Sequence, residues 1–178
     1  RDAGLPVSEK KDSTGVCFIG ERNFKQFLSG YLPAQPGDMV TPEGRVVGRH
    51  DGLMYYTLGQ RRGLGIGGGG NGQRWFVLGK DLARNRLVVS QGEDDALFSR
   101  GATGAGLTWL AERPPAAEGE PLDCQVRLRH RQPLQDCRLT LSGGRAHMAF
   151  AMPQRAVTPG QSAVFYQGQV CLGGAIVD

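Results

Sequence analysis

One cysteine, in a short segment bracketed by glycines, is the residue whose type and surroundings are best suited to chemistry. Cys17 lies in the octet Ser13-Thr14-Gly15-Val16-Cys17-Phe18-Ile19-Gly20. A thiol reacts as its thiolate, and nearby cations lower its pKa towards neutrality. The spacing alone favours a small buried hydrophobic residue, the usual role of a free cysteine. Charges of both signs flank it: Lys10, Lys11, Arg22 and Lys25 against Glu9, Asp12 and Glu21.

A second candidate is the alternating segment from Val126 to Arg131. As a strand it would place Val126, Leu128 and His130 on one face and Arg127, Arg129 and Arg131 on the other. Three neighbouring guanidinium groups repel one another unless an anion neutralises them, and they suit the geometry of phosphate. A solvated face with local carboxylate partners is the alternative, and the pattern alone does not decide between the two.

Two glycine-containing segments resemble phosphate loops only superficially. Arg61-Arg62 precedes a run of glycines, but the Gly-Lys-Ser/Thr ending of a P-loop is absent, so we expect a flexible loop. Ser142-Gly143-Gly144 lies between two expected strands, so we expect a hairpin turn. The four cysteines and three histidines lack metal-site spacing, so no metal site is expected. Cys124 and Cys137 could face each other across a hairpin and could in principle form a disulfide, but without a secretory signal we expect reduced thiols.

Composition limits the class of protein. The chain has 178 residues, 28 of them glycine, and a net charge of +4, which permits a polyanionic partner without requiring one. No apolar run approaches the ~18 residues of a membrane span, and no signal peptide is present, so we expect a soluble, cytoplasmic protein with no membrane partner. The chain opens at Arg1 without an initiator Met, which suggests a fragment.

The expected elements are mostly short strands. A helix is expected over 23–32, hairpins over 38–49 and 75–90, and a short helix or turn over 53–58. Six further strands, separated by glycine and proline turns, predict a closed small β-barrel. The fold class is therefore mainly β with a small α+β part, a small mixed central domain preceding a six-stranded barrel. The barrel strands are expected over 105–110, 122–131, 135–141, 145–152, 162–166 and 169–177.

Several blocks of the sequence, in order and nearly from end to end, resemble the family of tRNA-specific 2-thiouridylases. The block from Lys11 to Arg22 is similar to the family's second catalytic-cysteine segment. Further matching blocks are Tyr31 to Gly37, Gly52 to Gly67, Val157 to Tyr166 and Cys171 to Gly174. The resemblance covers the carboxy-terminal part of the family pattern. The Ser-Gly-Gly-x-Asp-Ser ATP loop, a catalytic Asp and the first catalytic cysteine, which the family carries in its amino-terminal domain, do not occur in this chain.

The resemblance implies a sulfurtransferase. The family thiolates C2 of the wobble uridine in tRNAs for glutamate, glutamine and lysine: ATP adenylates the base, and a cysteine persulfide supplies the sulfur. Cys17 would be the persulfide-bearing residue. ATP with magnesium would be a substrate of the full-length enzyme only, and no cofactor is expected in this fragment. The implied partners are tRNA, a sulfur-carrier protein and the missing amino-terminal ATP-binding domain, without which we expect the fragment to be inactive.

The same resemblance implies a barrel like the second domain of elongation factors, which contacts tRNA. It assigns tRNA contacts to Arg129, His130 and Gln161, and Arg127 and Arg131 are added from their charge. The expected domains are 1–26, a mobile catalytic-cysteine segment, 27–98, the central α+β domain, and 99–178, the barrel. The alternatives left open are a non-catalytic tRNA-binding module and, since no resolving cysteine lies nearby, the less favoured stand-alone thiol redox protein.

Overall fold

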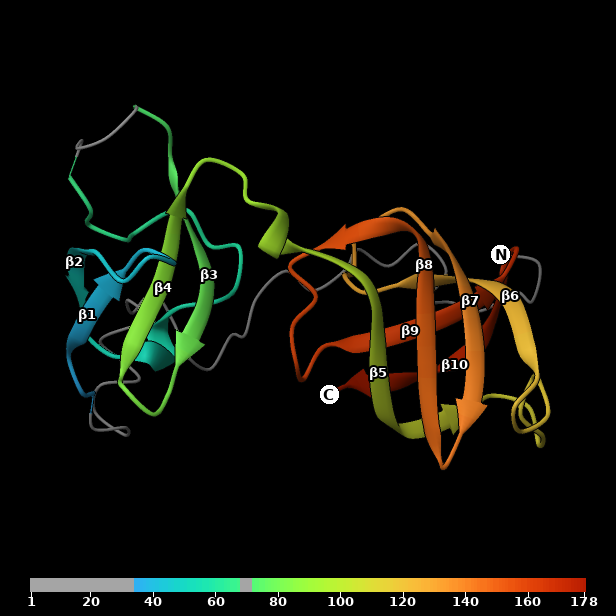
Figure 1. Ribbon diagram of the computed structural model, residues 1–178. Coiled ribbons are helices and arrows are strands. Elements are labelled where there is room, and N and C mark those ends of the chain that lie inside the picture. The colour runs from blue at the N-terminus through green and yellow to red at the C-terminus, as the bar shows by residue number, and fades with distance from the viewer. Residues whose placement is uncertain (1–33, 68–71) are drawn as a thin grey trace, which may run out of the picture. The chain divides into compact units, whose positions relative to one another are not determined.

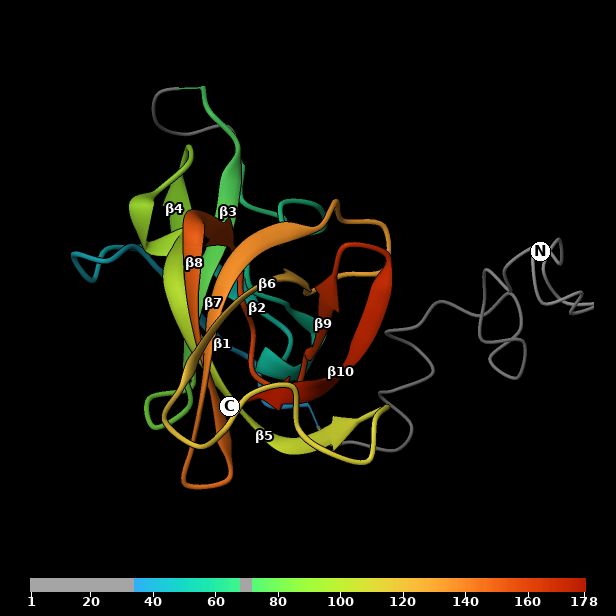
Figure 2. The same cartoon turned by 90° about the vertical axis from the view of Figure 1, so that its right-hand side faces the viewer.

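The computed structural model describes residues 34–67 and 72–178. Nearly all regular structure in these ranges is strand, arranged as a four-stranded sheet and a closed six-stranded barrel (Figures 1 and 2). The expected mainly-β fold, a smaller mixed part followed by a six-stranded barrel, is confirmed. No helix in the described ranges is long and apolar enough to cross a membrane. The expected helix over 23–32 and the Cys17 segment lie outside the described residues.

The four-stranded sheet consists of two hairpins placed side by side. Its strands are β1 (Gly37–Val40), β2 (Val46–His50), β3 (Trp75–Asp81) and β4 (Arg86–Gln91), in the order β2-β1-β4-β3. Each hairpin is antiparallel, as predicted, and β1 and β4 join them in parallel. The core of this part is formed by Met39, Tyr56, Leu64, Val77, Leu87 and Val89.

The segment between the hairpins contains a tight turn that is fixed against the sheet. The 3-10 helix η1 (Leu53–Tyr55) leads to Gly59, whose N–H donates to the Val77 carbonyl at 2.8 Å. The Gln60 carbonyl accepts from Val77 N at 3.0 Å. The Gln60 side chain accepts from Thr57 N at 3.0 Å and donates to the Arg62 carbonyl at 2.9 Å. Residues 59–62 therefore form a hydrogen-bonded turn.

After β4 and the short 3-10 helix η2 (Asp95–Leu97), the chain enters the barrel. The strands are β5 (Phe98–Trp109), β6 (Pro121–Arg127), β7 (Gln135–Ser142), β8 (Arg145–Arg155), β9 (Ser162–Gln167) and β10 (Val170–Val177). Their order is β10-β5-β8-β7-β6-β9, every pair is antiparallel, and β9 and β10 close the ring.

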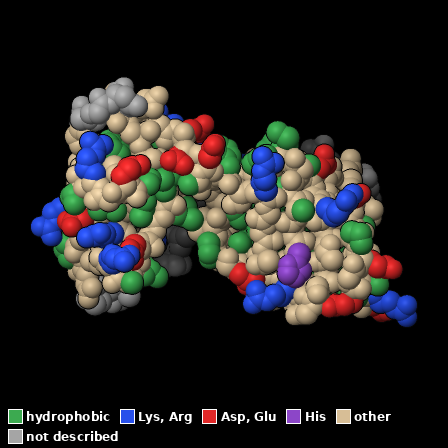
Figure 3. Space-filling model, viewed as in Figure 1, with side chains coloured by type: hydrophobic (Ala, Val, Ile, Leu, Met, Phe, Trp, Pro, Cys, Tyr) green, Lys and Arg blue, Asp and Glu red, His purple; other side chains and the backbone are tan. Residues whose placement is uncertain are grey.

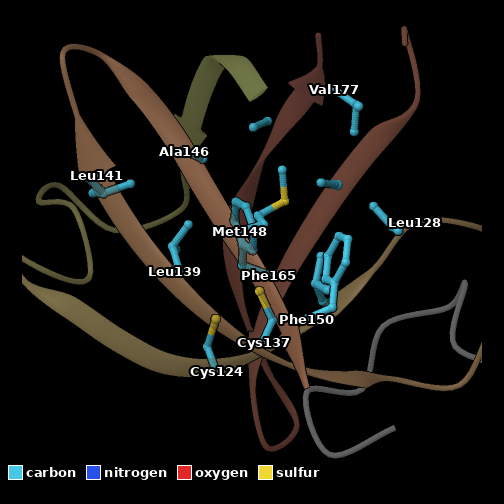
Figure 4. Close-up of a cluster of buried hydrophobic side chains, with 13 residues drawn as sticks. Cys124, Leu128, Cys137, Leu139, Leu141, Ala146, Met148, Phe150, Phe165 and Val177 are labelled. Carbon is cyan, nitrogen blue, oxygen red and sulfur yellow. The ribbon is translucent and has the colours of Figure 1, made fainter. Parts of the chain in front are cut away.

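The barrel core follows from the alternation of buried and exposed side chains along the central parts of its strands. From Cys137 to Leu141 in β7 and from Ala146 to Phe150 in β8 every second residue is buried, and Phe165 from β9 is fully enclosed (Figure 4). Because successive strand side chains point to opposite faces, this pattern fills the interior from all sides. The β7–β8 hairpin turns at Gly143 and Gly144, both at positive φ (58° and 71°), which confirms the predicted hairpin turn.

One expected strand ends earlier than its sequence pattern predicts. The alternation predicts a strand as far as Arg131, but β6 stops at Arg127. Leu128 still packs in the core, yet its N–H is bonded by the Gln132 side chain at 3.2 Å instead of by a strand. Gln132 N then donates to the Arg129 carbonyl at 3.0 Å and closes a turn. The prediction that His130 shares the inner face of a strand is therefore wrong, because His130 lies exposed in this turn.

Candidate functional site

The predicted contact residues gather around a depression at one rim of the barrel, which we call the rim hollow. Its volume is about 480 Å³, and it lies between the β6–β7 loop, the end of β8 and the turn before β9. Three arginines and four glutamines dominate its wall. The lining residues are Leu128, Arg129, Arg131, Gln132, Gln135, Met152, Pro153, Gln154, Arg155 and Gln161.

A chain of amide side chains holds the arginine-bearing loop in place. Gln154, only 4% exposed, lies at its centre. Its Oε1 accepts from Gln132 Nε2 at 2.8 Å, and its Nε2 donates to Gln135 Oε1 at 3.1 Å and to the Met152 carbonyl at 2.8 Å. Gln154 therefore ties both ends of the loop to β8, and Leu128 anchors the loop in the core beneath.

Arg129 and Gln161 are fixed by the next turn of the chain. Arg129 Nη2 donates to the Ala156 carbonyl at 3.1 Å, and the same oxygen accepts from the Thr158 hydroxyl at 3.1 Å. Gln161 Oε1 accepts from Thr158 N at 3.0 Å. Among the described residues no hydrogen bond occupies Gln161 Nε2, so this donor is available at the wall of the hollow.

The positive charge of the rim hollow is only partly compensated. Neither Arg129 nor Arg131 forms an ion pair within residues 34–67 and 72–178. Arg155 lies 3.4 Å (Nε) from Glu93 Oε1, and that carboxylate does not line the hollow. On the face shown in Figure 3, basic and acidic side chains are interspersed. The hollow can therefore take an anion, with planar guanidinium donors suited to phosphate oxygens.

The structure brings together only some of the predicted residues. Arg129, Arg131 and Gln161 line the hollow, whereas His130 is exposed on the same loop without lining it. Arg127 does not line the hollow either. It is half-buried, its guanidinium carbon lies 5.4 Å from the Tyr166 ring centroid, and its Nε has no hydrogen-bond partner among the described residues.

Sequence reasoning missed Arg155 and Gln154. They end β8 in the run Met152-Pro153-Gln154-Arg155, which has no alternation that would single out either residue. A buried glutamine after a proline-interrupted strand is a weak signal, since only its side-chain hydrogen bonds to Gln132 and Gln135 link it to the loop. The catalytic candidate Cys17 lies outside the described residues, so its surroundings stay a prediction.

A second depression, which we call the cysteine hollow, lies on the same barrel and has a volume of about 610 Å³. It is lined in part by Cys124 and Cys137, which stand opposite each other across β6 and β7, as predicted, and are free thiols (Figure 4). Arg138 there binds both carboxylate oxygens of Asp123, at 2.8 and 3.2 Å. These hydrogen bonds lower the pKa of Asp123 below its ordinary value.

Comparison with known proteins gives two family matches, one for each sheet. Residues 25–91 match the "tRNA methyl transferase PRC-barrel domain", and residues 99–177 match the "Aminomethyltransferase beta-barrel domain". The second match covers almost the whole of the barrel, and the first contains β1 to β4.

Individual relatives match the chain over nearly its whole length. The tRNA-specific 2-thiouridylase MnmA of Methylococcus capsulatus is 59% identical over 180 residues, which are 99% of this chain and 48% of the relative. The enzyme of the same name from Alkaliphilus oremlandii is 55% identical over 99% of this chain and 48% of its own length. That of Thiobacillus denitrificans is 57% identical over 99% and 50%. The chain thus spans about half the length of the curated relatives that it matches, and it belongs to the tRNA-specific 2-thiouridylase family, of which it represents the carboxy-terminal part.

Proposed function

We propose that this chain is the tRNA-binding and sulfur-carrying part of an enzyme that thiolates tRNA. The observation that supports tRNA binding is the rim hollow, where Arg129 and Arg131 stand without acidic partners among the described residues. Uncompensated guanidinium groups attract a polyanion, and phosphate contacts supply most of the affinity for nucleic acid. The names of the relatives identify tRNA as what those enzymes act on.

The chemistry that we propose for the whole protein follows the family. An amino-terminal domain adenylates the C2 oxygen of the wobble uridine in tRNAs for glutamate, glutamine and lysine, with ATP and magnesium. The terminal sulfur of a persulfide on Cys17, loaded by a sulfur-carrier protein, attacks C2, and AMP leaves with the oxygen. The other catalytic cysteine then attacks the Cys17 sulfur, so that 2-thiouridine is released and a disulfide remains. An alternative last step is release of sulfide by that cysteine before the attack. The reaction takes place in the cytoplasm.

Because adenylation is assigned to the amino-terminal domain, we expect the chain to be inactive on its own. The ATP loop and the first catalytic cysteine of the family are missing from these 178 residues. We therefore expect the purified chain to bind tRNA but neither to adenylate nor to thiolate it. Detectable ATP-dependent thiolation by the chain alone would contradict this part of the proposal.

The decisive experiment compares two variants of the full-length enzyme. Cys17→Ser should abolish formation of 2-thiouridine, measured by mass spectrometry of tRNA nucleosides, while the affinity for tRNA changes less than about twofold. A double variant, Arg129→Ala with Arg131→Ala, should instead weaken tRNA binding about tenfold and flatten its salt dependence. Arg138→Ala, which removes one arginine that already has a carboxylate partner, is the control for the loss of a paired arginine.

The outcomes separate the leading proposal from a non-catalytic tRNA-binding module. If Cys17→Ser retained thiolation, the persulfide role would be wrong and the binding role would stand. If the arginine double variant behaved like Arg138→Ala, the rim hollow would not be the tRNA contact. The contact of His130 implied by the family resemblance and the contact of Arg127 added from its charge are tested by the same salt titration of their alanine variants.

A further inference from the structure

Arg155 lies where the rim hollow adjoins a second depression of about 400 Å³. This neighbour, which we call the turn hollow, is lined by Gly59, Gln60, Arg61, Arg62, Phe76, Glu93 and Arg155. Arg155 is the side chain that both depressions share. The two hollows are therefore adjacent, and one guanidinium group forms part of the wall of each.

The position of Arg155 is set by packing on the small sheet. Its guanidinium carbon lies 5.3 Å from the centroid of the Phe76 ring, within the range of a cation–π contact. Its Nε lies 3.4 Å from Glu93 Oε1 but forms no hydrogen bond among the described residues. The side chain is 32% exposed and forms part of the wall of both hollows, so a ligand in either hollow can reach it.

The turn that carries Arg61 and Arg62 is held directly against the end of β8. Gly59 has a φ of +74°, and a Cβ placed there would lie 2.9 Å from Ala156 Cβ and 3.1 Å from Arg155 Nη1. Only glycine combines this backbone conformation with this close approach. The hydrogen bonds of Gln60 to Thr57 N and to the Arg62 carbonyl then fix the course of the turn.

The charge of the combined surface is strongly unbalanced. Five arginines line the two hollows against one carboxylate, that of Glu93. Neither Arg61 nor Arg62 forms an ion pair within the described ranges, and both are exposed. Phe76 is buried beneath Arg155, so it offers no open ring on which a base could stack. The surface is suited to a chain of phosphates and not to the reading of bases.

We propose that Arg155 joins the rim hollow and the Gly59–Arg62 turn into one continuous surface that binds successive phosphates of the tRNA backbone. This inference rests on the proposed tRNA binding at the rim hollow and extends it to Arg61, Arg62 and Arg155. The surface positions the tRNA without sequence information, because phosphates are the same at every nucleotide.

The test measures the affinity of the chain for unmodified tRNA as a function of salt concentration. Removal of one arginine that binds a phosphate should reduce the slope of log K against log salt by about 0.7–0.9. The double variant Arg61→Ala with Arg62→Ala should therefore reduce the slope by about 1.5 and weaken binding about tenfold, as Arg129→Ala with Arg131→Ala does. The control that removes the same charge is Arg45→Ala with Arg113→Ala, two exposed arginines that line neither hollow.

The test of Arg155 must distinguish phosphate binding from a purely structural role. The salt slope of tRNA binding serves for this, because a purely structural role would change thermal stability and not the slope. Arg155→Gln should reduce the slope by about 0.7–0.9. Arg155→Lys should restore the slope, even though it loses the planar stacking on Phe76 and lowers the thermal midpoint. If instead both variants reduced only thermal stability and left the slope unchanged, Arg155 would be structural and the continuous surface would be refuted.

The two proposals fail in different ways. If the Arg61 and Arg62 variant matched the Arg45 and Arg113 control while the Arg129 and Arg131 variant bound tRNA more weakly, the continuous surface would be wrong and tRNA binding at the rim hollow would stand. If the Arg129 and Arg131 variant also matched the control, or if the unaltered chain did not bind tRNA, both proposals would be wrong.

Discussion

The two hollows of the barrel differ in how their charges are satisfied. The cysteine hollow is the larger, at about 610 Å³ against about 480 Å³, but its arginine is held by the two carboxylate oxygens of Asp123. In the rim hollow, Arg129 donates only to a backbone carbonyl, and Arg131 has no ion-pair partner among the described residues. Volume alone would select the cysteine hollow as the binding site. Unsatisfied charge selects the rim hollow.

The side chains that surround the arginines also differ between the two hollows. Around the rim hollow, the glutamine chain through Gln154 fixes a loop whose arginines remain free of carboxylates. In the cysteine hollow, the only comparable amide contact among the described residues is a long one, from Gln125 Nε2 to Asp136 Oδ1 at 3.5 Å on the surface. A protein that must present unpaired guanidinium groups to a ligand needs neutral side chains to position them. Glutamine serves because it both donates and accepts without adding charge.

The largest effect should come from removing the centre of the glutamine chain. Gln154→Leu keeps a similar volume but leaves the amides of Gln132 and Gln135 without their shared partner. We expect a decrease of about 1–3 kcal/mol in the free energy of unfolding, since buried polar groups lose their hydrogen bonds. We also expect about tenfold weaker tRNA binding with a smaller salt slope, because the arginine loop is no longer fixed.

The matched change in the other hollow is Gln125→Leu, which removes only the long surface contact. Urea denaturation and salt titration of tRNA binding, both measured for the two variants, test the comparison. Equal effects of Gln154→Leu and Gln125→Leu on the salt slope would show that the glutamine chain does not position the arginines.

A smaller effect is expected for the reactivity of the cysteines. The hydrogen bond with Cys124, together with burial, raises the pKa of the Cys137 thiol, and both residues are less than 10% exposed. Cys171 is only half-buried. In a Cys17→Ser background, iodoacetamide should therefore modify Cys171 several-fold faster than Cys124 or Cys137, because burial shields both core thiols from the reagent and the Cys137 thiol also forms the reactive thiolate less readily.

Peptide mass spectrometry at increasing times gives the order of modification. Preferential labelling of Cys124 or Cys137 in the folded chain would mean that the cysteine hollow is chemically active. The contrast between the two hollows would then need revision.

The smallest effect concerns the ion pair of the cysteine hollow. The Arg138 guanidinium lowers the pKa of Asp123 below its ordinary value of 3.8. The pair therefore contributes its full stability above that value and loses it as the pH falls through the lower pKa of the folded state. The stability difference between the unaltered chain and Asp123→Asn should shrink between about pH 5 and about pH 2. It should be small throughout, because both side chains are exposed.

Urea midpoints at several pH values measure this difference. A difference that stayed constant down to the lowest pH would mean that the ion pair contributes nothing that depends on the charge of Asp123.

Most of the fold and about half of the candidate site could be predicted from the sequence. The hairpins were predictable because Thr41-Pro42-Glu43-Gly44 and Ser142-Gly143-Gly144 are strong local turn signals. The end of β6 was not predictable, because the alternation up to Arg131 is a strand pattern, and a local hydrogen bond from Leu128 N to the Gln132 side chain ends the strand early. Gln154 and Arg155 acquire their roles only through side-chain contacts with residues distant in sequence, which leave no mark on the local sequence.

The closure of the barrel has a consequence for the order in which it can fold. Its first strand, β5, pairs with its last, β10, for example Gly104 with Val177. Until residues near Val177 have left the ribosome, β5 and β9 are edge strands with unpaired backbone groups, which invite pairing with other chains. Contacts between segments so distant in sequence also form slowly. A newly made chain is thus most exposed to misassembly just before its last barrel strand emerges.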